Sequence, residues 1–168
     1  RRNERPEMTL TKSWVPGAND PDCPFPLNNL PYGVFLDNDG DRQCGVAIGG
    51  HILNVSAMEA DDLLDLPDIL IFSAGVWNDF MELGSTVWTD FRTFLTNALA
   101  VGSPQQAALN PYLVARVGTE MAMPFAVAEF TDFYSSRNHA TNVGTMFRGT
   151  ENALPPNWLH VPIGYNGR

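Results

Sequence analysis

The sequence of 168 residues is short of cysteine, of positive charge and of long apolar runs. Its two cysteines, Cys23 and Cys44, form no CxxC pair, and no signal sequence is recognisable. This pattern favours free thiols in a reducing compartment over a disulfide framework. No apolar run approaches the ~20 residues that a membrane-spanning helix needs. We therefore expect a cytoplasmic protein without a membrane segment.

Positive charge is scarce, because 10 Lys and Arg residues stand against 19 Asp and Glu residues and give a formal net charge of −9. Nucleic acids and anionic membranes attract proteins with a basic face, so neither is expected as a partner. The acidic run Asp37–Asp41 resembles the start of an EF-hand loop, but Ile48 occupies the position that needs a bidentate Glu. This run and the acidic residues at 59–68 are interpreted as solvated surface.

What the chain does have is an apolar fraction of 44%, with 13 prolines and 14 glycines. The apolar fraction is sufficient for a core, and the prolines and glycines predict many turns and short elements. Three short strands are predicted at residues 32–36, 45–48 and 51–55, joined by tight turns that contain glycine. Together they suggest a small, strongly bent sheet or barrel.

Helices are expected after these strands. Ser56 is a candidate N-cap for a helix over residues 57–66, which would stop at Pro67. Asn78 and Ser85 are candidate caps of two further helices, and the second of these carries an apolar stripe at helical spacing. The stripe, interpreted as core, consists of Val87, Trp88, Phe91, Leu95, Ala98 and Leu99.

A domain boundary is predicted at Pro124, because the amino-acid composition of the sequence changes there. Residues 8–124 form the first predicted domain, and the polar segment Arg1–Glu7 is left out of the fold prediction. Residues 125–168 form the start of a second domain, in which aromatic, polar and ionisable residues are crowded together.

Twenty residues of this second segment supply a carboxylate, a phenol, an imidazole and two guanidinium groups: Asp132, Tyr134, His139, Arg137 and Arg148. If residues 131–134 are extended, Asp132 and Tyr134 point to one side, and a helix beginning at Ser135-Ser136 would return His139 toward it. The mixture suits a metal ligand, a general base and anion-binding groups, and equally a polar surface loop. A hard cation needs about six oxygen ligands, so these residues alone describe an unfinished site.

The order of residues adds a resemblance to a known family. Residues 132–144, which read Asp-Phe-Tyr-Ser-Ser-Arg-Asn-His-Ala-Thr-Asn-Val-Gly, resemble the start of the catalytic domain of the fumarylacetoacetase family. Several long blocks in the right order are specific, whereas a lone histidine would not be. Further similar blocks lie at 25–26, 29–35, 45–49, 78–97, 146–148, 151–154, 156–160 and 164–165.

The resemblance implies a mainly β protein with helices, an α+β fold in two domains. The first domain would be an SH3-like β-barrel with added helices, and the second would begin a mixed β-roll catalytic domain. The family hydrolyses a carbon–carbon bond of 4-fumarylacetoacetate to give fumarate and acetoacetate in tyrosine and phenylalanine breakdown. A small-molecule substrate, a divalent cation (Ca²⁺ or Mg²⁺) and a homodimer are implied with it.

The same resemblance assigns roles to individual residues. Asp132 would bind the cation, and His139 would be the general base that takes a proton from the attacking water. Tyr134, Arg148 and Tyr165 would hold the carboxylate and keto oxygens of the substrate. The family's remaining metal carboxylates come later in its sequence than the last residue given, so the 168-residue piece is expected to be inactive.

Some positions depart from the family pattern, and two alternative functions stay open. Asn138 and Asn166 differ from the pattern at positions without a metal or base role. One alternative is another member of the wider superfamily, which would hydrolyse or decarboxylate a different 2-oxo or β-diketo acid. The other is a folded interaction module without catalysis. His51 is interpreted as structural, and His160 as a hydrogen-bonded core position.

Overall fold

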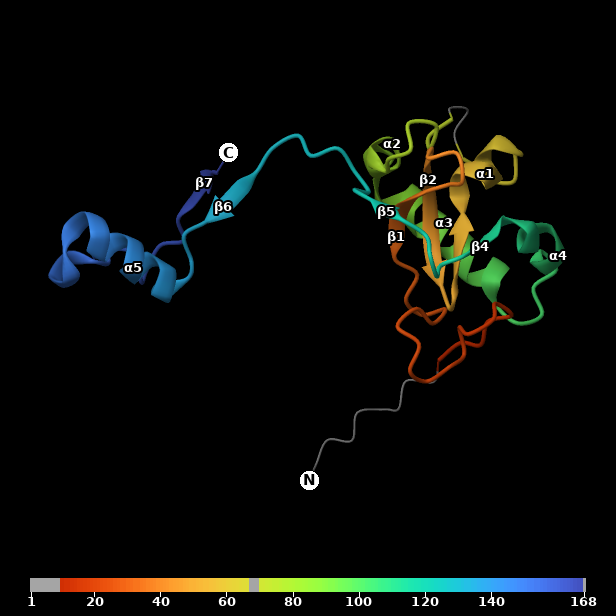
Figure 1. Ribbon diagram of the computed structural model, residues 1–168, viewed down its shortest axis with the longest axis horizontal. Coiled ribbons are helices and arrows are strands. Elements are labelled where there is room, and N and C mark those ends of the chain that lie inside the picture. Colours follow the sequence, from red (N-terminus) through yellow and green to blue (C-terminus); the bar gives the residue numbers. More distant parts are fainter. Residues whose placement is uncertain (1–9, 67–69, 168) are drawn as a thin grey trace, which may run out of the picture. The chain divides into compact units, whose positions relative to one another are not determined.

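The computed structural model describes residues 10–66 and 70–167. The chain divides into two compact units, of which unit 1 ends at Ala126 and unit 2 begins at Val127 (Figure 1). The polar segment Arg1–Glu7 and the expected helix stop at Pro67 lie outside the described residues.

Unit 1 is built around an antiparallel sheet with the strand order β4-β3-β2-β1-β5. The three predicted strands are confirmed as β1 (Tyr32–Leu36), β2 (Arg42–Ile48) and β3 (His51–Asn54). The short strands β4 (Leu113–Ala115) and β5 (Met121–Ala122) were not predicted, and they form the two edges. An α+β fold is therefore confirmed, but the sheet of the described residues is open and does not close into a barrel.

Two turns connect the central strands. Gly49 has a φ of 56°, and a Cβ there would lie 2.5 Å from the Pro16 carbonyl oxygen, so the β2–β3 turn requires glycine. In the β1–β2 turn the Asp37 carboxylate accepts hydrogen bonds from the backbone N–H groups of Asp39 and Asp41 at 3.0 and 2.9 Å. The acidic run thus contributes to closing its own turn.

Helix α1 (Val55–Ala60) differs at both ends from the predicted helix. Asn54 is its N-cap and accepts a hydrogen bond from the Ala57 N–H, whereas the Ser56 hydroxyl accepts one from the Cys44 N–H. The helix ends early because Asp62 adopts a left-handed conformation (φ 57°), with the backbone hydrogen bonds of a Schellman motif. The predicted cap at Ser56 is therefore wrong.

Helices α2 (Asn78–Glu82) and α3 (Gly84–Leu99) follow, and the predicted side-chain caps at Asn78 and Ser85 are not formed. Asn78 instead donates its amide to the Ala126 carbonyl and accepts from the Ala126 N–H. Four residues of the predicted stripe are buried, but Trp88 is 42% exposed. The buried members are Phe91, Leu95, Ala98 and Leu99.

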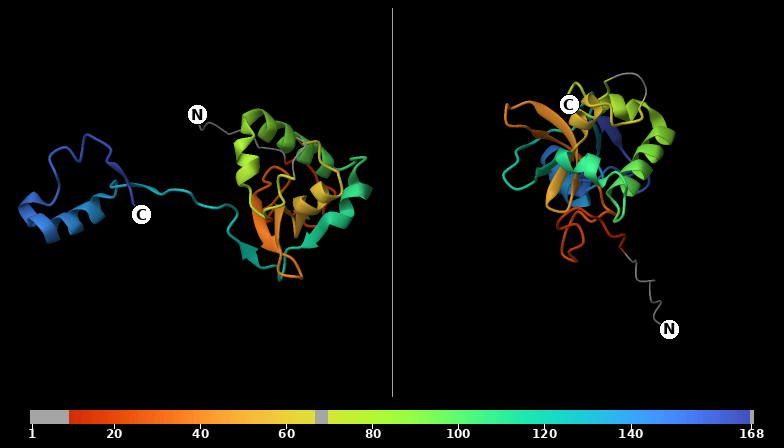
Figure 2. Two further views of the ribbon diagram at one scale, coloured as in Figure 1. Left: turned by 90° about the horizontal axis from the view of Figure 1, so that it is seen from above. Right: turned by 90° about the vertical axis from the view of Figure 1, so that its right-hand side faces the viewer.

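Helix α3 covers one face of the sheet (Figures 1 and 2), and aromatic side chains fill the space between them. Tyr32 of β1 stacks on Trp77 with ring centroids 4.7 Å apart, and Phe80 and Phe91 contact both rings. Helix α4 (Gln106–Leu109) and the 3-10 turn η1 (Asn110–Tyr112) lead from α3 to β4.

No described helix is both long and apolar enough to cross a membrane.

Unit 2 contains a two-stranded ladder, β6 (Thr131–Phe133) with β7 (Gly164–Asn166), and the helix α5 (Arg137–Arg148) with the 3-10 turn η2 (Thr150–Asn152). The predicted extended piece and the serine-capped helix are confirmed, because the Ser136 hydroxyl accepts a hydrogen bond from the His139 N–H. Within residues 127–167, the buried residues of unit 2 are all small: Ala140, Gly144 and Ala153. Phe147 and Met146, by contrast, are 79% and 74% exposed.

Candidate functional site

The β6–β7 ladder places Asp132 directly opposite Tyr165. The Tyr165 hydroxyl donates to Asp132 Oδ2 at 3.3 Å, and Asp132 Oδ1 accepts from the Phe133 N–H at 2.9 Å. The negative charge of Asp132 raises the pKa of Tyr165 above its ordinary value. The phenol therefore stays protonated at neutral pH and remains a hydrogen-bond donor beside the carboxylate.

Tyr134 continues the strand direction of β6, because its N–H donates to the Ile163 carbonyl at 3.0 Å. Residues two apart on an extended strand share a face, so Tyr134 lies on the side of Asp132. Its hydroxyl donates to the Ala140 carbonyl at 3.1 Å, which ties the strand to α5. The phenol ring is thus held in place at the junction of β6 and α5.

His139 occupies the third position of α5, where its backbone N–H is bound by the Ser136 cap. Its imidazole is exposed and meets the Tyr134 ring edge-on, with centroids 5.9 Å apart. Four of the predicted residues therefore form two contact pairs, Asp132 with Tyr165 and Tyr134 with His139. Tyr134 is near enough to Tyr165 to raise its pKa, so the two pairs belong to one group in unit 2.

Arg148 is not part of this group. It is the last residue of α5, nine positions after His139, and a rise of 1.5 Å per residue separates their backbones by roughly 13 Å. Its guanidinium donates to the carbonyls of Asn152 and Ala153 at 3.1 and 2.8 Å. In this structure Arg148 therefore fastens the η2 turn onto the end of α5.

Gly144 allows the η2 turn to pack closely against α5. A Cβ at this position would lie 1.8 Å from the Ala153 carbonyl oxygen, so only glycine lets the turn approach the helix this closely. The close approach buries Ala140 and Ala153, which are the small apolar residues at the centre of unit 2.

The described residues supply only part of a cation site. Asp132 offers the hard carboxylate oxygens that Ca²⁺ and Mg²⁺ prefer. Across residues 10–66 and 70–167, however, no group of three or more His, Cys, Asp or Glu side chains is placed to hold a metal ion. Asp132 therefore suits one ligand position, and the described part of the chain does not supply the set.

A pocket of about 270 Å³ lies beside Tyr134 and is walled by the segment from Trp158 to Ile163. The Trp158 indole N–H donates to the Tyr134 carbonyl at 2.8 Å, a role that sequence reasoning missed although Trp158 lies in a block similar to the family. The predicted core position of His160 is wrong, because its side chain is exposed at this pocket. His51 is half-buried in β3, and its buried Nδ1 has no hydrogen-bond partner among the residues that the structure describes.

Comparison with known proteins decides the family. A family model described as fumarylacetoacetase N-terminal matches residues 28–124, which is more than half of the chain. The chain belongs to the fumarylacetoacetase family. The resemblance stated from the sequence blocks is therefore confirmed.

Curated fumarylacetoacetases are also similar to this member of the family. Those of Bos taurus and Homo sapiens are 45% and 44% identical to it, and each comparison covers 93% of the chain. That of Dictyostelium discoideum is 39% identical over 96% of the chain. Coverage of this extent includes residues of unit 2, which lies outside the match to the family model. The chain spans 38% to 39% of the length of these relatives.

Proposed function

We propose that this chain is the N-terminal part of a fumarylacetoacetase, which hydrolyses the carbon–carbon bond of 4-fumarylacetoacetate to fumarate and acetoacetate. The observation that carries the proposal is the 45% identity to a protein named fumarylacetoacetase across 93% of the chain. The linked group Asp132, Tyr165, Tyr134 and His139 supports it, because these side chains combine an anion, hydroxyl donors and a base.

In this proposal His139 takes the proton of the attacking water. Its imidazole is exposed to solvent, so water and substrate reach it without any rearrangement of the described residues. The Ser136 cap and the Tyr134 ring fix the start of α5 and limit the positions open to the imidazole. A base held in one place is effective because proton transfer requires hydrogen-bond distance to the water.

The two tyrosines are proposed to bind substrate oxygens. Tyr165 already acts as a donor to a carboxylate, and its raised pKa keeps that proton in place at neutral pH. Tyr134 donates to a backbone carbonyl of α5, from which a substrate oxygen would have to displace it. Each phenol has a single O–H, so a substrate oxygen would likewise have to displace Asp132 from Tyr165.

Asp132 is proposed as one ligand of a divalent cation, either Ca²⁺ or Mg²⁺. When bound, such a cation would polarise a carbonyl oxygen and stabilise negative charge on the leaving group. Asp132 Oδ2 is already engaged by Tyr165, so the tyrosine would orient the carboxylate for this ligation. The other ligands would come from outside the described residues, so the 168-residue piece is expected to show no turnover.

Arg148 is proposed to bind the terminal carboxylate of the substrate, although its donors are occupied by backbone carbonyls here. Its guanidinium has five N–H donors, and the two hydrogen bonds to carbonyls leave other donors free. A carboxylate could therefore bind while Arg148 still holds the η2 turn. Loss of this residue would then weaken substrate binding and loosen the turn together.

Residues 8–124 would form an SH3-like domain, with β4 and β5 as edges of an incompletely closed barrel, and residues 125–168 would begin a β-roll. The protein would act in the cytoplasm on a small-molecule substrate and form a homodimer. The alternative is that the same site belongs to another hydrolase or decarboxylase of the superfamily.

The deciding experiment removes the proposed base from the complete protein to which this chain belongs. His139→Ala should lower turnover of 4-fumarylacetoacetate by about 10²–10⁴-fold, because general-base catalysis contributes that much. Asn138→Ala, at the exposed neighbouring position, should keep near-normal turnover. Both variants should give the circular dichroism spectrum of the parent protein. The proposal would be overturned if His139→Ala kept more than half of the parent turnover. It would also be overturned if the parent protein turned over other 2-oxo acids faster than 4-fumarylacetoacetate.

A further inference from the structure

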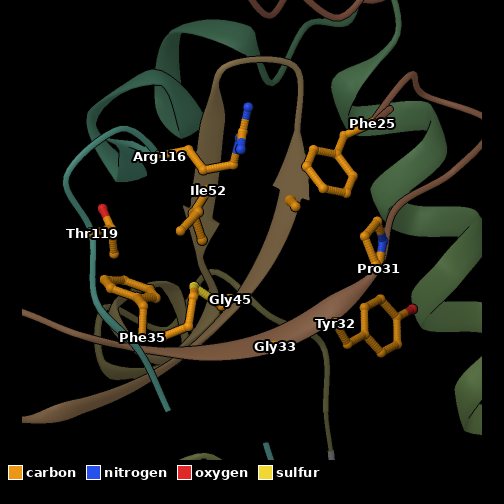
Figure 3. A pocket seen from close by; sticks show the side chains of 11 residues that line it. Phe25, Pro31, Tyr32, Gly33, Phe35, Gly45, Ile52, Arg116 and Thr119 are labelled. Carbon is orange, nitrogen blue, oxygen red and sulfur yellow. The ribbon is translucent and has the colours of Figure 1, made fainter. Parts of the chain in front are cut away.

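The face of the unit 1 sheet that is turned away from α3 contains a hollow of about 380 Å³ (Figure 3). Gly33 of β1 and Gly45 of β2 lie directly opposite each other at its floor. Glycine inside a strand weakens the sheet and often marks a place where another group approaches the backbone closely. Because two facing glycines carry no side chains of their own, the side chains of neighbouring residues can lie against the sheet here.

Apolar side chains cover these two glycines. Phe35 and Ile52 are both buried and converge over Gly45, so that a Cβ at residue 45 would lie 2.5 Å from Ile52 Cγ2. At Gly33 an added Cβ would lie 3.2 Å from the Met121 Cε, at the edge strand β5. The floor of the hollow therefore consists of apolar side chains packed closely on the two glycines.

One charged residue lines the hollow, and it is a cation. Arg116 follows β4, and its guanidinium carbon lies 5.1 Å from the centre of the Phe25 ring (Figure 3). Within the described ranges Arg116 has no carboxylate partner, although the whole chain carries a net charge of −9. The planar guanidinium keeps its N–H donors free for a bidentate hydrogen bond.

We propose that this hollow binds a small organic carboxylate with a flat apolar body. The body would lie against the side chains of Phe35, Ile52 and Phe25, and the carboxylate would pair with Arg116. The volume falls within the range of small-molecule pockets, which begins at about 300 Å³, and few polar groups are typical of them. The inference goes beyond the proposed function, because all of these residues belong to unit 1 and none belongs to the Asp132–His139 group.

The test titrates the ¹⁵N-labelled 168-residue chain with phenylacetate and, separately, with phenylacetamide, which has the same shape without the charge. Phenylacetate should shift the amide signals of Gly33, Gly45 and Ala47 saturably. Phenylacetamide should bind on the order of tenfold more weakly, because a hydrogen bond between charged groups is replaced by a neutral one. Arg116→Gln should lower the affinity for phenylacetate by about the same factor.

Two further variants separate charge from shape. Lys12→Gln removes one positive charge from unit 1 outside the hollow and should leave the affinity for phenylacetate unchanged. Gly33→Ala adds a methyl group to the floor against the flexible end of Met121, so it should weaken both probes while the chain stays folded.

Several outcomes would overturn the proposal. They are the absence of saturable shifts, shifts centred elsewhere in unit 1, and equal affinity of Arg116→Gln and the parent chain for phenylacetate. The complete protein provides the last comparison. If its Gly33 and Gly45 signals do not respond to phenylacetate while those of the 168-residue chain do, later parts of the protein cover the hollow and no ligand site exists. None of these readouts depends on catalysis, so the proposed function can fail independently.

Discussion

Unit 1 and unit 2 differ most in what lies at their centres. Unit 1 contains a continuous core of apolar side chains in which Trp77, Phe80 and Phe91 contact one another. The centre of unit 2 consists of Ala140, Gly144 and Ala153, and its large apolar residues are mostly exposed. Burial of large apolar side chains is the main favourable term in folding, so the two units must be stabilised differently. The side chains proposed for chemistry all lie in the unit with the smaller core.

The largest expected effect concerns the core of unit 1. Leu95 of α3 is completely buried, and Leu95→Ala should lower the free energy of unfolding of unit 1 by about 2–5 kcal/mol. Urea denaturation followed by circular dichroism measures this change. Leu95→Met is the control and should cost less than about 1.5 kcal/mol, because it nearly conserves volume. If Leu95→Ala unfolds both units together, the division into two units with separate stability is wrong.

The corresponding substitution in unit 2 is at Gly144, where an added methyl group would collide with the backbone of the η2 turn. Gly144→Ala would force the η2 turn away from α5, and we expect a loss of about 1–3 kcal/mol, as for other overpacked positions. Hydrogen exchange should show lost protection across α5 and unchanged protection in β1–β3. Asn142→Ala, at an exposed position of the same helix, is the control. Unchanged exchange in Gly144→Ala would mean that the close approach of turn and helix does not stabilise unit 2.

A smaller effect is expected at the start of α5. Ser136→Ala removes the N-cap and should destabilise the helix by about 0.5–1 kcal/mol, the lower part of the range, because the hydrogen bond is 3.4 Å long. The amide of His139 should then exchange faster with solvent. Ser135→Ala alters the preceding serine, which does not cap the helix, and should leave that amide unchanged. Equal rates in the two variants would contradict the capping role.

The smallest effect compares two tyrosine–aspartate pairs, one in each unit. The pKa of Tyr165 is raised mainly by the charge of Asp132, and the pKa of Tyr112 is raised mainly by its hydrogen bond to Asp61. Asp132→Asn should therefore lower the pKa of Tyr165 toward 10.0 and leave that of Tyr112 unchanged. A pH titration of the tyrosine ring carbons by NMR measures both. An unchanged Tyr165 would show that Asp132 is not its neighbour in solution.

The sequence predicted the elements whose signals are local. Strands β1 to β3 were predicted because apolar residues lie between glycine-containing turns, and α5 because Ser136 precedes a helical segment. Strands β4 and β5 were missed, since runs of two or three residues become strands only by pairing with β3 and β1. The cap of α1 was misplaced by two residues, because Ser56 is used by the backbone of β2 instead.

The candidate site was predictable only through the resemblance to the family. From composition alone, the same residues could equally have formed a polar surface loop. No spacing rule links Asp132 to Tyr165, because they lie 33 positions apart in the sequence. Their contact depends on the β6–β7 pairing, which the sequence analysis did not identify. Arg148 looked equivalent to the other site residues in the sequence. Its separation from them follows from the length of α5, which places it at the opposite end of the helix.

The hydrogen bonds around Ala126 have a mechanical consequence. The side-chain amide of Asn78 binds both the N–H and the C=O of Ala126, and the Trp77 N–H binds the Pro124 carbonyl at 2.9 Å. A pulling force applied to the chain beyond residue 126 would therefore load these three bonds before it reached the aromatic side chains behind them. Asn78 would therefore be an anchor at the point where the polypeptide leaves unit 1.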